Sequence, residues 1–554
     1  MKWILFSGTV GLAAVLGAAT AHGAGESDRE VMRQRMEHFM FLGEIQVAGV
    51  PIVARDLLPK FYAQRDFDLA WKDAARIAQL YELADVAFAE GLNKQDYALD
   101  TLRLLLPAQG LPQDAVSRVE LDVLATEIFI RIGYQLRFGK VNPQKLFGDW
   151  NFNRELVPGV DPLETIQAAV DSDSLLEFAA QRIVRGPLYT VLVRELAAKR
   201  ALQRAGGWHE VPAGPALREG DQGERVEALR RRLEISGEID RDASAADRSM
   251  FDASLKEGVV RFQSHHGLDA DGIVGQKSFA ALNVPVGDRI DQIRASLERG
   301  RWVFDSVNSS PDMILVNIAT ARVAFIRNRE FVWDSIVQVG KPYRQTPVFK
   351  GLLEYVVISP TWTVPPGILR RDIMPRLKKD AIGYLNEKDM DVLDMSGNVI
   401  DPASIDWAQV SARNFPYMIR QRPGPKNALG RIKFIFPNSH FVFLHDTPSR
   451  ALFERADRTF SSGCVRVKDP FELAELVLDE PEKWNASTFE TELARKQTRV
   501  VHLANPLPVF LLYWTAEASP DGSVRYVDDV YGRDKVVLEA LARPPSIDLP
   551  SARG

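Results

Sequence analysis

Apolar residues recur every three or four positions through most of the first 205 residues of the chain. Three segments show this spacing with charged residues between the apolar ones: Ala74–Glu90, Ala115–Phe138 and Leu175–Ala205. The period is typical of helices that bury one face, and Asp114 and Asp173 occupy positions suited to helix caps. Because no group of catalytic side chains stands out here, the pattern predicts a helical scaffold over residues 25–205, with a substrate platform or a surface for partner proteins as the alternative.

A second helical pattern follows a loop rich in Gly, Pro and Ala at residues 206–215. Val226, Leu229 and Leu233 fall on one helical face, and glycines that favour turns divide the stretch that follows them. Residues 215–285 are therefore predicted to form a small helical bundle. Residues 286–310 are expected to form a helix that links this domain to the rest of the chain.

The pattern changes near residue 311, where short runs rich in β-branched and aromatic residues replace the helical spacing. The runs cover residues 313–318, 322–326, 331–339, 354–359, 431–436, 441–444, 499–503 and 509–515. Thr320 and Asn328-Arg329 mark turns between the first three runs, and Asp469-Pro470 opens the one clear helix. Residues 311–545 are therefore expected to form a mostly β domain.

One stretch of this β region, residues 368–428, is irregular and rich in charge. A segment of this length between strands is expected to be an insertion that caps the domain or acts as a lid. Residues 546–554 complete the chain as a tail. The fold class predicted for the whole chain is multidomain α+β.

The N-terminus begins with Lys2, continues with an apolar stretch from Ile4 to Ala19 and then reads Ala19-Thr20-Ala21. A short positive region, an apolar region and a small-x-small site are typical of a signal peptide that is cleaved on export. We therefore predict a signal peptide over residues 1–24. An uncleaved N-terminal membrane anchor is the alternative.

Composition excludes several classes of function. The net charge of −5 gives no broad basic surface for nucleic acid, and the chain contains neither an HExxH helix nor a GxxxxGK[ST] phosphate loop. Its eight His residues are scattered. His265 and His266 are helix neighbours that point about 100° apart, so we expect surface or helix-end positions rather than a metal site.

The chain has a single cysteine, Cys464, which cannot form an intramolecular disulfide. It lies 19 residues after His445, which follows a β-type run, so a loop of that length can bring both side chains together across neighbouring strands. A thiol beside an imidazole is the minimum for nucleophilic acyl transfer. The backbone N–H groups of Gly463 and Cys464 are candidate oxyanion donors, and Arg466 is a candidate partner for the thiolate or for a carboxylate.

Each of these residues taken alone has a simpler interpretation. A lone Cys is often a small buried apolar residue, and a His at a strand end is often structural. The combination of Cys464 and His445 in a chain predicted to be exported favours the catalytic interpretation.

His445-Asp446-Thr447 and Ser461-Ser462-Gly463-Cys464-Val465-Arg466 resemble the signature of L,D-transpeptidases with a YkuD-type catalytic domain. Further stretches resemble the large Gram-negative YcbB-like subfamily: residues 317–318, 337–341, 344–349, 362–366, 422–430 and 434–438. Residues 217–284 resemble the small three-helix peptidoglycan-binding domain, with Ser278 in place of the more usual Thr. Shorter family members have His where this chain has Ser462, a difference that the large subfamily tolerates.

This resemblance implies a periplasmic enzyme in which Cys464 attacks the L-centre carbonyl of meso-diaminopimelate in a tetrapeptide stem and releases D-alanine. The side-chain amine of a second diaminopimelate then attacks the thioester and gives a 3→3 cross-link. His445 moves the protons, oriented by a backbone carbonyl, so Asp446 is not expected to act as a triad acid. No metal or organic cofactor is needed.

The resemblance also implies how further residues and partners take part. Gly463, Ser462 and Arg466 shape the oxyanion and substrate side. Weaker candidates for substrate contact, with packing as the alternative role, are Trp362, Asn427 and Phe443. The partners are peptidoglycan stem peptides and other wall-synthesis proteins through the scaffold, with no nucleic acid and membrane contact only through an N-terminal anchor.

Other cysteine enzymes match the sequence less well. Papain-like and NlpC/P60 peptidases place Cys before His, whereas only His502, in a strand-like run, follows Cys464 here. A sortase domain is smaller, and its Cys follows a Thr-rich strand end. The second class is a non-catalytic cell-wall-binding protein, in which residues 217–284 bind and Cys464 is inert. Cross-linking, hydrolysis, D-amino-acid exchange and protein attachment all share the thioester, and access of water or amine decides among them.

Overall fold

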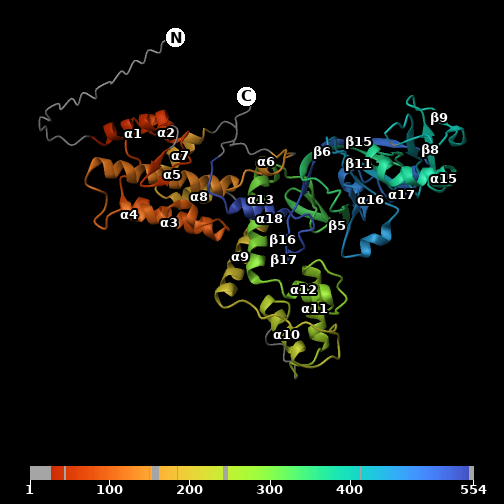
Figure 1. Cartoon of the computed structure of the whole chain (residues 1–554), viewed down its shortest axis with the longest axis horizontal. Coiled ribbons are helices and arrows are strands. Elements are labelled where there is room, and N and C mark those ends of the chain that lie inside the picture. Colours follow the sequence, from red (N-terminus) through yellow and green to blue (C-terminus); the bar gives the residue numbers. More distant parts are fainter. Residues whose placement is uncertain are drawn as a thin grey trace, which may run out of the picture.

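A computed structural model describes residues 27–42, 45–148, 150–152, 161–183, 185–240, 247–411 and 413–547 of the chain. The predicted signal peptide lies outside these residues. Within them, no helix combines the length and the apolar character that crossing a membrane requires. Figure 1 shows the scaffold helices at one end of the molecule, a large sheet toward the other and a helical lobe below.

The scaffold is a bundle of helices with a short hairpin. Its elements are α1 (Asp28–Leu42), β1 (Gln46–Val47), β2 (Val50–Pro51), α2 (Leu58–Gln64), α3 (Ala74–Ala89), η1 (Lys94–Tyr97), α4 (Leu99–Leu105), α5 (Ala115–Phe138), α6 (Pro143–Leu146), α7 (Pro162–Val170), α8 (Leu175–Arg182) and α9 (Pro187–Arg204). The helices predicted from residues 74 and 115 are confirmed as α3 and α5, and the Asp114 carboxylate caps α5 by accepting the N–H of Ser117. The segment 175–205 is two helices, because Pro187 starts a new one. Ser174, rather than Asp173, caps α8.

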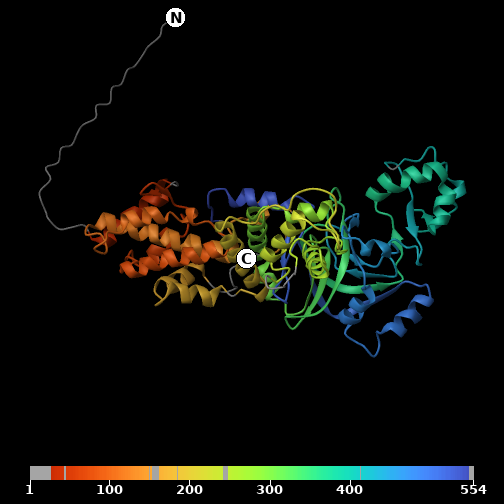
Figure 2. The ribbon, with the colours of Figure 1, turned by 90° about the horizontal axis from the view of Figure 1, so that it is seen from below.

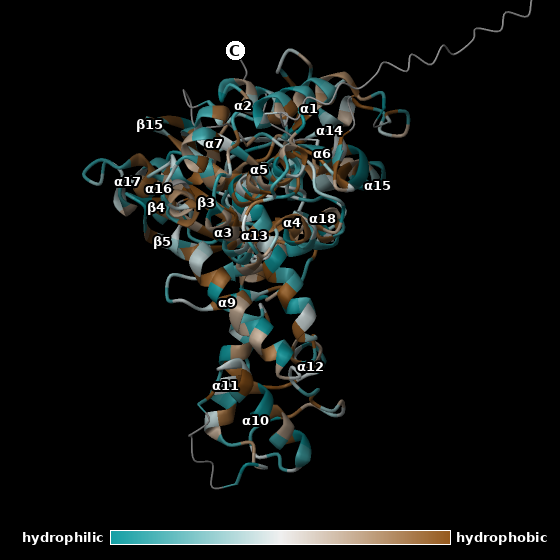
Figure 3. Ribbon diagram, turned by 90° about the vertical axis from the view of Figure 1, so that its left-hand side faces the viewer, coloured by the Kyte–Doolittle hydropathy of each residue, from teal (hydrophilic) through white to brown (hydrophobic). Residues whose placement is uncertain are grey.

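Three further helices form the lobe that projects from the body in Figure 3: α10 (Glu224–Ser236), α11 (Ala253–His265) and α12 (Gln276–Leu282). Val226, Leu229 and Leu233 are fully buried in its core, as their spacing predicts. The lobe is therefore a small domain with an apolar centre of its own.

The lobe contacts the body through His266, which directly follows α11. Its half-buried ring stacks on Phe262, with centroids 3.8 Å apart, and on Tyr526 of β17 (Val524–Tyr526), at 5.8 Å. The helix-end position is confirmed, but a surface position is wrong for this residue, because its ring fills the contact between lobe and body.

A long central helix, α13 (Val286–Asn308), leads from the lobe to the C-terminal half and runs beside α9 (Figure 1). The Arg294 guanidinium donates to the carbonyl of Gly91 in the scaffold, at 3.0 Å. The Gln292 amide donates to the carbonyl of Val527 beyond β17, at 2.7 Å. This helix thus contacts scaffold and sheet region alike.

The C-terminal half is built on a nine-stranded sheet in the order β13-β5-β14-β12-β11-β6-β15-β3-β4. Its strands are β3 (Met313–Asn317), β4 (Arg322–Arg327), β5 (Glu330–Gly340), β6 (Phe349–Ile358), β11 (Ile432–Ile435), β12 (Leu444–His445), β13 (Thr459–Ser461), β14 (Val465–Val467) and β15 (Arg499–Leu512). The turns at Thr320 and Asn328-Arg329 are confirmed. The predicted runs 499–503 and 509–515 belong mainly to one long strand, β15, whose register shifts between His502 and Leu507.

Alternation along the central strands gives the sheet two different faces. Phe434, Leu444 and Val465 are fully buried on one face and pack in the core with α16 (Pro470–Leu478) and α17 (Ala486–Ala494). Their sequence neighbours project from the other face. Asp469 precedes α16 as predicted, but its carboxylate accepts a hydrogen bond from Ser335 instead of capping the helix.

The segment between β6 and β11 forms a small subdomain with its own apolar core, in contrast to the irregular structure expected from its charge. Its elements are β7 (Trp362–Thr363), α14 (Pro366–Ile368), the π-helix η2 (Leu369–Ile373), α15 (Met374–Glu387), β8 (Met390–Leu393), β9 (Val399–Ile400), η3 (Pro402–Ser404) and β10 (Met418–Gln421). Figure 2 shows it standing apart at the end of the molecule far from the scaffold. We call this segment the cap.

Three further elements complete the C-terminal half of the chain. They are η4 (Arg450–Glu454), β16 (Ala516–Ala518), which pairs with β17, and α18 (Arg533–Leu541). The described residues thus confirm the predicted fold class: a helical N-terminal region joined to a region built on a β-sheet.

Candidate functional site

Four side chains stand in one row across the middle of the sheet. β11 pairs Lys433 with His445, β12 pairs His445 with Arg466, and β14 pairs Arg466 with Gln338. Residues that are paired directly across strands project from the same face of a sheet. Cys464 lies two residues before Arg466, at the end of the turn that leads into β14, so the alternation of the strand directs its side chain toward the same face.

The turn before Cys464 is held by hydrogen bonds of its own side chains. Ser461 Oγ donates to the carbonyl of Cys464 at 2.5 Å and accepts the N–H of Gly463 at 3.1 Å. Gly463 has φ +123°, a conformation that L side chains rarely adopt, so glycine is required there. The turn fixes where the Cys464 backbone enters β14.

His445 is oriented by its own strand end. Its Nδ1 lies 2.5 Å from the carbonyl oxygen of Asp446, and a carbonyl only accepts, so Nδ1 carries the proton. Nε2 is then the basic nitrogen. The Asp446 carboxylate instead accepts the backbone N–H of Arg431 and lies 3.3 Å from Arg450, so it takes no part in orienting the ring.

Burial determines the protonation of both groups. It lowers the pKa of His445 to about 3, with the neighbouring cations Arg466 and Lys433 acting in the same direction. Burial also raises the pKa of the Cys464 thiol, although the Phe443 backbone, Lys433 and Arg466 act against it. At pH 7 the resting pair is therefore a thiol beside a neutral imidazole. Cys464 is partly exposed, so a substrate can reach it.

Two residues that the sequence did not single out, Thr346 and Tyr531, stabilise the Cys464 turn through hydrogen bonds. Thr346 is fully buried, donates to the carbonyl of Gly463 at 2.8 Å and accepts the N–H of Gly340 at 2.9 Å. The Tyr531 hydroxyl donates to the carbonyl of Gly340 at 2.5 Å. Both residues thereby tie the Cys464 turn to β5 and to the segment before α18.

A third unpredicted residue connects the turn with the cap. Arg344 donates from Nη1 to Ser462 Oγ at 2.8 Å and makes two hydrogen bonds to the Asp372 carboxylate of η2, at 2.7 and 2.9 Å. The ion pair lowers the pKa of Asp372. Ser462, predicted on the oxyanion side, thus faces the cap.

The other candidates for the oxyanion side are Gly463, Cys464 and Arg466, and they differ in whether their N–H groups already have hydrogen-bond partners. The Gly463 N–H donates to Ser461 Oγ, so the expectation that it faces an oxyanion is not met in this structure. The Cys464 N–H makes no hydrogen bond among the described residues. Arg466 Nη1 donates to Gln338 at 3.1 Å, and its buried Nε has no partner in the described part of the chain. The Cys464 N–H is therefore the better donor for an oxyanion.

The three weaker candidates for substrate contact lie in different parts of the structure. Phe443 is half-buried on the site face, with the Lys433 ammonium 3.9 Å from its ring centroid. Trp362 lies in β7 and packs against the core of the cap. Asn427 is 1% exposed and donates to the carbonyls of Pro360 and Arg422, so the expectation of substrate contact is wrong for this residue.

Lys433 is the functional residue that sequence reasoning missed. It is half-buried, and burial lowers its pKa. Its signal in the sequence is a single charge between Ile432 and Phe434, which are both fully buried. Only the register of β11 against β12 shows that this charge stands beside His445.

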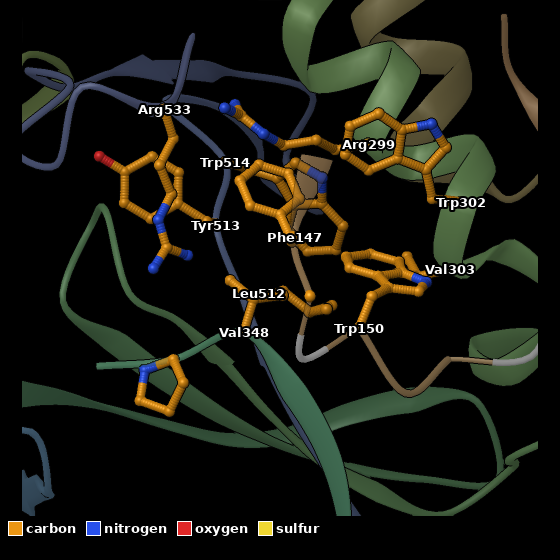
Figure 4. Close-up of a pocket in the computed structure, with 12 residues that line it drawn as sticks. Phe147, Trp150, Arg299, Trp302, Val303, Val348, Leu512, Tyr513, Trp514 and Arg533 are labelled. Atoms are coloured by element: carbon orange, nitrogen blue, oxygen red, sulfur yellow. The ribbon is translucent and has the colours of Figure 1, made fainter. Parts of the chain in front are cut away.

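A pocket of about 270 Å³ lies between scaffold, α13 and sheet, away from the Cys464 row (Figure 4). Aromatic side chains such as Trp150 and Tyr513 line it together with Arg299 and Arg533. Arg533 donates to Gln345, which precedes Thr346. Among the described residues, no three His, Cys, Asp or Glu side chains gather as metal ligands would.

Three family models match parts of the chain. The "L,D-transpeptidase catalytic domain" (YkuD) matches residues 311–501, the "Scaffold domain" residues 56–196 and the "Putative peptidoglycan binding domain" residues 222–282. The row of paired residues and the Cys464 turn lie inside the first match, and the projecting lobe lies inside the third.

Individual proteins are similar over shorter shares of the chain. A protein of Haemophilus influenzae described as a "Putative L,D-transpeptidase" is 40% identical over 224 residues, which is 40% of this chain and 45% of that protein. The match thus spans less than half of that relative's length. An L,D-transpeptidase structure from Xylanimonas cellulosilytica has 15% identity and a TM-score of 0.18, covering 55% of this chain and 100% of that one. One from Stackebrandtia nassauensis has 11% identity and a TM-score of 0.20, covering 55% and 96%.

Proposed function

We propose that this chain, which carries an L,D-transpeptidase catalytic domain of the YkuD family beside a peptidoglycan-binding domain, cross-links peptidoglycan stem peptides through a thioester on Cys464. The observation that supports this most directly is that the Cys464 turn leads straight into β14, the strand that pairs with β12 of His445. The hydrogen bond from His445 Nδ1 leaves Nε2 as the base for the thiol proton.

In the first step the thiol proton passes to His445 Nε2 as sulfur attacks the L-centre carbonyl of diaminopimelate in a tetrapeptide stem. A C–S bond forms, and the carbonyl oxygen becomes negative within reach of the Cys464 N–H. The C–N bond to D-alanine then breaks. The imidazolium returns its proton to the leaving amine, and a thioester remains.

In the second step the side-chain amine of another diaminopimelate attacks the thioester. His445 takes a proton from this amine, a C–N bond forms and the C–S bond breaks. The proton then returns to sulfur and restores the thiol. The product is a 3→3 cross-link.

The protein's other parts support the same assignment. The lobe within residues 222–282 matches a peptidoglycan-binding domain and contacts the body through His266, so wall bound there would stay near the sheet. We propose a periplasmic location after export by residues 1–24. The scaffold would contact other wall-synthesis proteins.

The direct test is intact-mass analysis after incubation with a carbapenem, whose strained lactam acylates a reactive thiol. The wild-type protein should gain one adduct, and Cys464→Ser should gain none. Incubation with disaccharide tetrapeptides should give 3→3 dimers and free D-alanine in the wild type only. An unmodified wild-type protein that forms no dimers would contradict the proposal.

The same variant separates the enzyme from a non-catalytic wall-binding protein. We expect Cys464→Ala to bind isolated peptidoglycan sacculi as the wild type does, while forming no dimers. Equal dimer yields from both proteins would show that Cys464 is inert and favour the binding protein.

A further inference from the structure

The row across the sheet places a cation on each side of His445. Lys433 is paired with it in β11 and Arg466 in β14. No carboxylate of the described residues forms an ion pair with either cation, and Cys464 is the only group whose charge favours their protonated forms. This face of the site is therefore positive and has no protein anion to balance it.

The nucleophile does not supply the missing anion in the resting state. Burial raises the pKa of the Cys464 thiol, so sulfur is neutral at pH 7. A half-buried ammonium without an anion is costly, because most of its water has been removed. The resting site is therefore prepared for an anion that arrives from outside.

The two cations differ in how freely they can receive this anion. Arg466 is held by Gln338, which is fully buried and itself donates to the carbonyl of Ser449 at 3.1 Å. The Lys433 ammonium makes no hydrogen bond or ion pair within the described residues and lies over the face of the Phe443 ring, 3.9 Å from its centroid. The ammonium of Lys433 thus has N–H donors that no protein oxygen among the described residues accepts, and these can bind a ligand.

We propose that Lys433 binds the carboxylate of the D-amino acid that leaves the donor stem peptide. The inference rests on the proposed function and names what the site recognises beside the scissile bond. In a tetrapeptide stem this carboxylate lies one Cα from the scissile nitrogen. Neighbouring strands are about 4.8 Å apart, so a lysine one strand from His445 has the reach to meet it. A donor with an amide or a further residue at that position loses the ion pair.

The test compares two donor peptides that differ only at this group: a tetrapeptide stem ending in D-alanine and the same peptide ending in D-alanine amide. We would measure thioester formation by rapid-quench mass analysis for wild type, Lys433→Met and Lys433→Arg. The wild type should prefer the free acid by about ten- to a hundredfold in kcat/KM. Lys433→Met should lose most of this preference by slowing the acid alone, and Lys433→Arg should keep it.

The controls separate this role from a structural one. Lys378→Met removes an exposed lysine of α15 and should leave the preference unchanged. Equal slowing of both peptides by Lys433→Met would overturn the inference, since Lys433 would then act on the thiol. A wild type without preference would overturn it as well, while the proposed function stands. A wild type that reacts with neither peptide would overturn the proposed function together with the inference.

Discussion

The turn that carries Cys464 and the cap that touches it are held in opposite ways. Thr346 and Ser461, both buried, fasten the turn by hydrogen bonds to backbone groups. The cap has its own core and meets the turn through Arg344, whose partners Asp372 and Ser462 are exposed. Breaking a buried hydrogen bond costs about 1–3 kcal/mol, whereas an exposed ion pair contributes about 0–1 kcal/mol. The turn of the proposed nucleophile is thus fixed firmly, and its contact with the cap is weak.

The largest effect should come from removing the proposed base, His445. We expect His445→Ala to lower the rate of thioester formation by about 10²- to 10⁴-fold, because the thiol then loses its proton acceptor. Rapid-quench mass analysis with a tetrapeptide donor measures this rate. Asp446→Asn keeps the backbone carbonyl that orients the ring and is expected to lose far less. An equal loss in both variants would mean that the carboxylate is part of the machinery.

The pH profile should reveal how strongly the fixed site perturbs His445. With a pKa of about 3, the imidazole stays neutral at pH 5, with Nε2 unprotonated, whereas an ordinary histidine of pKa 6.5 would be about 97% protonated there. We therefore expect kcat/KM to keep its value down to pH 5 instead of falling about thirtyfold. The folded state also binds no proton on this residue between pH 6.5 and 3, so His445 lowers stability as the pH falls through this window. An acidic limb near pH 6.5 would contradict the burial argument.

A substitution that keeps the shape of a buried side chain but removes its hydroxyl should destabilise the Cys464 turn. Thr346→Val deletes the hydroxyl that serves both Gly463 and Gly340, and we expect a loss of about 1–3 kcal/mol of unfolding free energy with about tenfold slower acylation. Urea unfolding and acylation kinetics measure the two effects. Thr498→Val removes one hydroxyl hydrogen bond, to the carbonyl of Ser359, and serves as the control. If both variants acylate at the same rate, the turn does not depend on Thr346.

The smallest effect should come from the link to the cap. Arg344→Ala removes the partly exposed ion pair with Asp372, so stability should change by about 1 kcal/mol or less and kcat/KM by about two- to fivefold. Arg371→Ala removes a neighbouring exposed charge of the cap and should change neither quantity as much. A loss with Arg344→Ala as large as with Thr346→Val would remove the distinction between a fixed turn and a loosely held cap.

Much of the fold follows from patterns that depend on near neighbours. The period of apolar residues predicts α3 and α5, and turn residues mark the first hairpins of the sheet. The break at Pro187 is also local, yet the pattern on both sides is continuous and conceals it. The cap was expected to be irregular because its charges mask the apolar residues, such as Leu377 and Val392, that form its core.

The candidate site could be predicted only in part. Cys464 and His445 stand out by residue type, and a short loop joins them. Lys433 and Thr346 stand out only once the strands are paired, because their roles come from register and from contacts across 12 and 117 residues. Asn427 was predicted to contact substrate because it lies in a stretch that resembles the family, but its buried side chain donates a hydrogen bond to the carbonyl of Pro360 instead.

The cap leaves the sheet from β6 and returns in β11, and these strands are neighbours, with Ile358 paired directly to Ile432. Both ends of the insertion therefore meet at one point of a continuous hydrogen-bonded ladder. A two- to five-residue hairpin can join such ends, so the whole cap can be excised or exchanged while the strand order of the sheet stays as it is. The cap is thus a separable insertion: apart from the strand ends, the contact with the Cys464 turn described above is the one through Arg344 and Asp372.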